Sequence, residues 1–122
     1  MRALVIDDSR AMRAIIKKIL VEIGFEVIEA GNGREALVAL QDHMPVDLAL
    51  VDWNMPEVSG IDFIRVVRGE RAYDQVRLMM VTTETEQSQM ATALELGANE
   101  YIMKPFTKEI LLSKLTLLGL VP

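Results

Sequence analysis

Short apolar runs and longer amphipathic stretches alternate along this chain of 122 residues. The short runs predict five β-strands, at Ala3–Ile6, Phe25–Ala30, Asp47–Val51, Arg77–Thr82 and Glu100–Met103. Between and after them, apolar residues recur at the three- and four-residue spacing of one helix face. This spacing predicts helices around residues 12–23, 36–40, 61–68, 90–94 and 110–118. Gly24 and Gly97 follow two of these stretches, where a glycine commonly ends a helix.

Strands that are separated by single helices pair in parallel through right-handed crossovers, so the pattern predicts an α/β fold with three layers. The first and third strands are almost wholly apolar, as central parallel strands are. The second and fifth carry polar positions, which suits the edges of a sheet. These differences favour the doubly wound, flavodoxin-like order 2-1-3-4-5 of a five-stranded parallel sheet. We expect residues 1–122 to form a single domain with no output domain.

Composition excludes several classes of function. The net charge of −5 argues against nucleic-acid binding, which requires a basic surface. The absence of cysteine excludes disulfides, thiol catalysis and thiolate metal sites. No apolar run is long enough to span a membrane, and the N-terminus turns acidic too early for a secretory signal. We expect a cytoplasmic protein.

Polar residues whose side chains can bind ligands or take part in catalysis follow or end four of the five predicted strands: Asp7, Asp8, Asp52, Thr82 and Lys104. In this fold, ligands bind at the carboxyl ends of the strands, near the switch point between the first and third strands. Singly, these residues have ordinary explanations as helix caps, turn residues or surface lysines. Together they indicate a site.

Three carboxylates within a few ångströms of one another repel strongly, so such a cluster needs cations nearby. Oxygen ligands without histidine or cysteine favour a magnesium-type ion. A metal, a lysine and a hydroxyl around one carboxylate suit phosphoryl transfer, with Asp52 as the nucleophile.

Four stretches carry a resemblance to a known family: Leu4–Ser9, Val51–Pro56, Val81–Glu84 and Lys104–Phe106. In their order and spacing they resemble the receiver domain of two-component response regulators, and most of all the stand-alone chemotaxis receivers. The resemblance covers nearly the whole chain. It implies a flavodoxin-like fold and a phosphorylation-activated switch rather than an enzyme acting on outside substrates.

By this resemblance, Asp52 accepts phosphate from a histidine kinase or a small phosphodonor. Asp8, Asp52 and the backbone carbonyl of Asn54 are implied ligands of Mg²⁺, with Asp7 acting through a bound water. Lys104 is implied to pair with the phosphoryl group, and the Lys104–Pro105 bond to be cis.

The resemblance also implies how the modification is transmitted. Thr82 moves toward the phosphoryl group and Tyr101 turns inward behind it, while Asn54 and Glu84 tune the lifetime of the phosphate. An output protein, such as a flagellar switch protein in chemotaxis, is implied to bind the fourth helix, fifth strand and fifth helix. A phosphatase is a possible further partner. We expect a monomer.

Three functions compete at this point. The first is a signalling switch that binds a partner protein. The second is a stand-alone receiver that serves as a phosphate sink or relay intermediate, which the sequence does not separate from the first. The third is an aspartyl-phosphate phosphatase or phosphotransferase. Such enzymes place an acid two residues after the nucleophile, where this chain has Asn54, and this difference argues against turnover.

Overall fold

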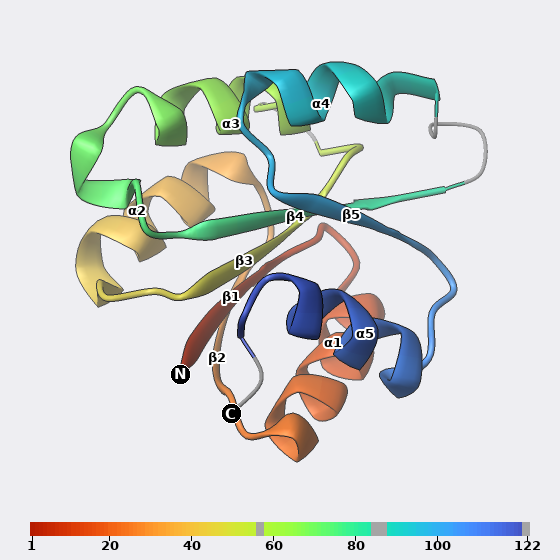
Figure 1. Ribbon diagram of the computed structural model, residues 1–122. Helices are drawn as coiled ribbons and strands as arrows, with labels where there is room; N and C mark the ends of the chain where they lie inside the picture. The colour runs from red at the N-terminus through yellow and green to blue at the C-terminus, as the bar shows by residue number, and fades with distance from the viewer. Residues whose placement is uncertain (56–57, 84–87, 121–122) are drawn as a thin grey trace.

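The computed structural model describes residues 1–55, 58–83 and 88–120. Figure 1 shows a central sheet with helices on both sides. Its strands are β1 (Arg2–Ile6), β2 (Glu26–Ala30), β3 (Leu48–Asp52), β4 (Arg77–Thr82) and β5 (Glu100–Met103). The α-helices are α1 (Arg10–Ile23), α2 (Gly33–His43), α3 (Gly60–Arg68), α4 (Met90–Leu96) and α5 (Lys108–Leu117), and a 3₁₀ turn, η1 (Arg71–Tyr73), precedes β4.

The five strands form one parallel sheet in the order β2-β1-β3-β4-β5, which confirms the predicted topology. The third strand differs slightly from the prediction at its end. Asp52 pairs with Val81 of β4, so it is the last residue of β3 rather than the first residue of the following turn. This pairing holds the Asp52 backbone in the sheet.

Two apolar clusters, one on each face of the sheet, explain the layers. On one face, α2, α3 and α4 pack against alternate strand residues such as Ile6, Val51 and Met80. On the other, α1 and α5 pack against the intervening residues, such as Val5 and Leu50. Because β3 lies between β1 and β4 and is covered on both faces, all of its residues are buried, whereas β2 and β5 at the sheet edges are partly exposed.

Polar caps fix where most of the helices begin. Four N-cap side chains accept a hydrogen bond from the backbone N–H three residues later and so satisfy an otherwise unpaired donor: Ser9, Asn32, Ser59 and Thr107. Gly24 ends α1 with φ of 118°, a left-handed conformation that suits glycine. None of the helices that the structure describes is long and apolar enough to cross a membrane.

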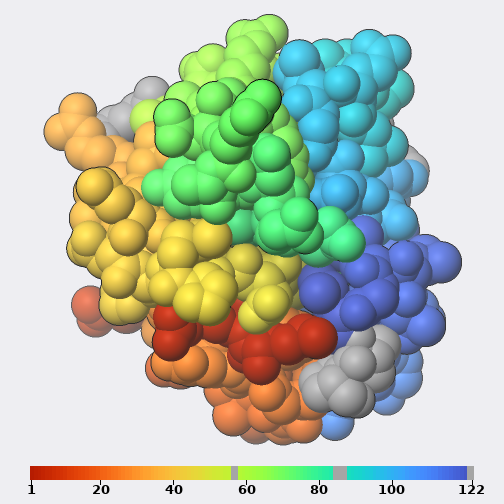
Figure 2. Space-filling view, turned by 60° about the vertical axis from the view of Figure 1, so that its left-hand side comes forward, coloured from red at the N-terminus to blue at the C-terminus, as the bar shows by residue number. Residues whose placement is uncertain are grey.

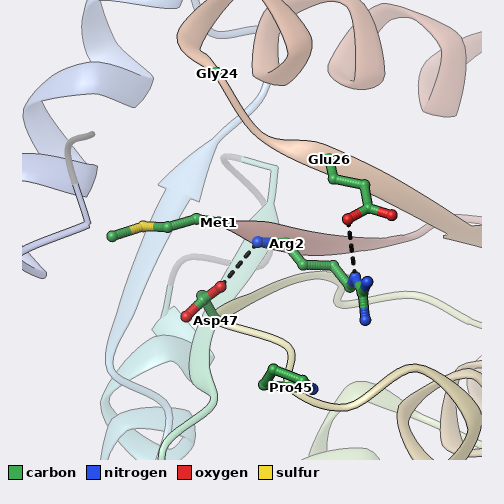
Figure 3. A pocket seen from close by; sticks show the side chains of 6 residues that line it. All are labelled: Met1, Arg2, Gly24, Glu26, Pro45 and Asp47. Carbon is green, nitrogen blue, oxygen red and sulfur yellow. Dashed lines mark hydrogen bonds and ion pairs between the residues drawn. The ribbon is translucent and has the colours of Figure 1, made fainter.

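The amino ends of the strands form the edge opposite to the one where Asp52 lies. Figure 2 shows the start of the chain (red) beside the segment that leads into β3 (yellow). A pocket at this edge (Figure 3) is lined by Met1, Arg2, Gly24, Glu26, Pro45 and Asp47. Its charged groups pair among themselves: the Arg2 backbone N–H donates to Asp47 at 2.8 Å and its side chain to Glu26 at 3.2 Å. This pairing accounts for the polar lining of the pocket as a structural feature.

Candidate functional site

Three carboxylates meet at the carboxyl edge of the sheet, between β1 and β3. Asp7 and Asp8 directly follow β1, and Asp52 ends β3. Each offers an oxygen, and the three oxygens lie within 4.8 Å of one another. Asp7 and Asp52 are only 2% and 5% exposed, whereas Asp8 is open to solvent. Two nearly buried acids and one exposed acid therefore share a space large enough for a cation.

The backbone around α1 fixes Asp7 in this cluster. One carboxylate oxygen, Oδ1, accepts a hydrogen bond from the Ser9 backbone N–H at 2.8 Å. The Arg13 guanidinium donates to the Asp7 carbonyl at 2.6 Å and pairs with Glu29 at 3.2 Å. Among the described residues, the buried Oδ2 of Asp7 has no hydrogen-bond partner. Because buried polar atoms are nearly always hydrogen-bonded, this oxygen is a candidate to bind a cation or a metal-bound water.

Lys104 brings a positive charge to the cluster. It directly follows β5, which is separated from β3 by β4 in the sheet. Its backbone N–H donates to the Thr82 carbonyl at 2.8 Å, which continues the pairing of β4 with β5. Its Nζ lies 3.6 Å from Oδ2 of Asp7 and 3.6 Å from Oδ1 of Asp52. These separations are ion pairs rather than hydrogen bonds, so one ammonium is shared by two acids. The Lys104–Pro105 peptide bond is cis, as the family resemblance implies.

The surroundings of Asp52 make its ionisation unusual. Burial is the main cause, and the Asp7 carboxylate the next, of a rise in its pKa from 3.8 to about 6. Lys104 and the Asn54 backbone N–H, which donates to Oδ1 at 3.3 Å, act in the opposite direction. At neutral pH Asp52 is therefore mostly ionised, but its charge is poorly compensated.

Of the remaining predicted residues, the structure describes Thr82, Asn54 and Tyr101. Thr82 is fully buried at the end of β4, and its hydroxyl donates to the Thr83 carbonyl at 3.2 Å. Asn54 is exposed just beyond Asp52, and Tyr101 is half-buried on β5. Pro56 and Glu84 lie outside the described residues.

Trp53 forms a contact that the sequence does not indicate. Its indole N–H donates to the Gln89 side chain at 3.1 Å, immediately before α4. The indole is 8% exposed and packs in the cluster formed by α2, α3 and α4. The residue next to Asp52 therefore contacts the start of α4, although 36 positions separate the two partners in the sequence.

Comparison with known proteins identifies the family. The model of the response regulator receiver domain matches residues 3–116. The chain belongs to the response regulator receiver family. It is 44% identical to a chemotaxis protein CheY homolog of Campylobacter jejuni over 116 residues, which cover 94% of this chain and 89% of the relative. It is 42% identical to chemotaxis protein CheY1 of Helicobacter pylori, again with 94% of this chain and 94% of the relative covered.

A solved structure gives the same result for this receiver domain. Chemotaxis response regulator CheY4 of Vibrio cholerae superposes with a TM-score of 0.87 and 34% sequence identity, covering 95% of this chain and 96% of that one. The chain is thus a receiver domain of two-component signalling, similar to CheY chemotaxis proteins. Receiver domains of this kind are signalling proteins and not classical enzymes.

Proposed function

We propose that this receiver is a phosphorylation-activated switch in which Asp52 accepts a phosphoryl group from the phosphohistidine of a histidine kinase. The observation that carries the proposal is the placement of Asp52 in a nearly buried position, 3.6 Å from the Lys104 ammonium. An ionised carboxylate with a pKa of about 6 is available as a nucleophile at neutral pH. Its backbone is held in β3, which keeps the oxygen at the open edge of the sheet.

In the transfer, an oxygen of Asp52 forms a bond to phosphorus as the bond between phosphorus and the histidine nitrogen breaks. The imidazole leaves with the electron pair of that bond and takes up a proton. Lys104 supplies positive charge beside the phosphoryl oxygens, where negative charge must be neutralised. The Asn54 backbone N–H donates to Oδ1 of Asp52, the oxygen that also faces Lys104, and helps to orient the attacking carboxylate.

The residues of the acid cluster fit a magnesium ion. Asp7, Asp8 and Asp52 are hard oxygen donors within 4.8 Å of one another, and Oδ2 of Asp7 is buried without a hydrogen bond among the described residues. We propose that Asp8, Asp52 and the Asn54 carbonyl hold Mg²⁺, with Asp7 acting through a water. When bound, the ion neutralises the acids and the phosphoryl oxygens that approach them.

The response to modification would pass through β4 and β5 to the surface formed by α4, β5 and α5. Thr82 ends β4 beside the cluster, and its hydroxyl is now bonded to a backbone carbonyl, from which it can turn toward a phosphoryl oxygen. Tyr101 lies on the edge strand and packs against the α2-α3-α4 cluster, so an inward turn of its ring would alter this surface. A chemotaxis output protein is the proposed partner, since the relatives carry chemotaxis names.

The test is phosphorylation by acetyl phosphate, followed by intact-protein mass spectrometry. We expect one added phosphoryl group in the presence of Mg²⁺ and none after chelation with EDTA. Asp52→Asn should abolish the addition. The matched control Asp42→Asn, at an exposed acid on α2, should leave it unchanged. Equal labelling of the Asp52→Asn protein would exclude Asp52 as the acceptor.

A second measurement separates the switch from a phosphate sink. Proteins retained by the beryllofluoride-loaded receiver are compared with those retained by the unmodified form. A partner that binds only the loaded form supports the switch, whereas identical sets of partners would refute it.

A further inference from the structure

The ammonium group of Lys114 lies over the ring of Tyr101. Its Nζ is 4.8 Å from the ring centroid, within the range of a cation–π contact. The same nitrogen is 3.2 Å from Oε1 of Glu100. The trio lies on β5 and α5, and the proposed phosphoryl transfer at the acid cluster uses neither Lys114 nor Glu100.

Glu100 holds Lys114 in this place. Its Oε1 accepts two hydrogen bonds, one from the Lys114 ammonium and one, at 2.9 Å, from the Tyr101 backbone N–H. The side chains of Lys114 and Glu100 are only 26% and 19% exposed. Partial burial makes this pair less subject to screening than an ordinary surface pair. Lys114 is therefore directed at the ring.

The contact connects two faces of the sheet around its edge. Tyr101 packs against the cluster formed by α2, α3 and α4, whereas Lys114 comes from α5, which covers the opposite face. The two meet because β5 is the edge strand. The structure shows the ring in one position, with Lys114 over it. We infer that an inward turn of the ring toward the α4 side, as the proposed switch requires, would take it away from Lys114 and break this contact.

We propose that Lys114 is a positioning residue that holds the Tyr101 ring, in the unmodified receiver, in the position where the ammonium lies over it. The proposal rests on the proposed function, because it takes Tyr101 as the element that turns inward when Asp52 is modified. A contact made in only one state favours that state by its own free energy. By linkage, a group that favours the unmodified state must also weaken the binding of a phosphoryl analogue at Asp52.

The test is a titration with beryllofluoride in the presence of Mg²⁺, followed by the fluorescence of Trp53. Lys114→Met removes the charge but keeps an apolar side chain, and it should bind beryllofluoride about two- to fivefold more tightly. Lys114→Arg keeps the cation over the ring and should behave like the wild type. A purely electrostatic effect of Lys114→Met would instead weaken beryllofluoride binding, since the loss of a positive charge disfavours a bound anion.

Two controls identify the route of the effect. Lys108→Met removes the same charge from α5 at a side chain that pairs with Glu22, and it should not tighten binding. In a Tyr101→Leu background, Lys114→Met should have no further effect, because the ring through which it acts is gone. If Lys114→Met does not fold, Glu100→Gln releases the lysine from its anchor and should also tighten binding.

The outcomes separate this inference from the proposed function. If the wild type shows no beryllofluoride binding that depends on Asp52, the proposed function fails. If the wild type binds but Lys114→Met binds equally or more weakly, the positioning role of Lys114 is overturned. An equal effect of Lys114→Met with and without the Tyr101 ring would overturn it too.

Discussion

Replacing Asp52 with asparagine should stabilise the unmodified protein at neutral pH, in spite of removing the central residue of its site. In the folded chain the Asp52 carboxylate is 5% exposed and lies near Asp7, and these two features raise its pKa from 3.8 to about 6. In the unfolded chain the carboxylate is hydrated and ionises at its ordinary pKa. Ionised Asp52 therefore opposes folding, and asparagine has nearly the same shape without the charge.

The sign and size of the effect follow from the pKa difference. Between about pH 4 and pH 6, folded Asp52 keeps a proton that the unfolded chain releases. The free energy of unfolding consequently falls as the pH rises through this window, by at most about 3 kcal/mol, since one pKa unit corresponds to about 1.4 kcal/mol. Lys104 loses one of its two partners in the variant, so we expect a net gain of about 1–3 kcal/mol at pH 7.

Urea denaturation measures this difference, with EDTA present and at several pH values from 4 to 7.5. The gain of Asp52→Asn over the wild type should be largest near pH 7 and small near pH 4, where wild-type Asp52 is protonated. Asp42→Asn, on the exposed side of α2, controls for the loss of one charge. A gain that is absent at pH 7, or equal at pH 4 and pH 7, would refute the assignment of an electrostatic penalty to Asp52. With Mg²⁺ added, the wild type should recover stability and the variant should recover less.

Three other predictions concern the site and its supports. Lys104→Met should raise the pKa of Asp52 further, because the Lys104 ammonium lowers that pKa in the wild type. Titration followed by NMR of the carboxyl carbon measures it, and an unchanged or lower pKa in the variant would contradict the prediction. Gly97→Ala should lower the free energy of unfolding by about 1–3 kcal/mol, because φ is +120° and a Cβ would lie 2.6 Å from Cγ of Arg68; an unchanged urea midpoint would contradict this. Trp53 fluorescence should respond first to Mg²⁺ and then to acetyl phosphate, and a second response that persists in Asp52→Asn would show that it does not report phosphorylation.

The topology could be predicted because each strand carries its position in the sheet as a pattern of polarity. β1 after Arg2 and β3 before Asp52 are buried on both faces, and these parts of the two strands carry only apolar residues. β2 has exposed Glu26 and Glu29, which marks an edge. The order of the strands then brings Asp7, Asp52 and Lys104 to one edge, because all parallel strands end on the same side.

The contacts that hold the site could not be predicted in the same way. Arg13 donates to the Asp7 carbonyl because the orientation of α1 turns its side chain back over β1, and the helical pattern fixes a face but not this angle. The bond from Trp53 to Gln89 depends on how far α4 lies from β3, a distance that no sequence pattern records. The place of Lys114 over the Tyr101 ring likewise results from packing around the sheet edge.

The electrostatics of the cluster suggest why modification of Asp52 would be felt beyond the site. The unmodified receiver already has three carboxylates within 4.8 Å and one ammonium shared between two of them. A phosphoryl group adds further negative charge and acceptor oxygens to this space, and positive charge and hydroxyl donors are what it requires. Mg²⁺ and Lys104 can meet part of that need without movement. The Thr82 hydroxyl, at the end of β4, donates to a backbone carbonyl, so it can serve the phosphoryl group only by turning. We expect this turn to change the packing beside β5, the edge strand that pairs with β4 and carries Tyr101.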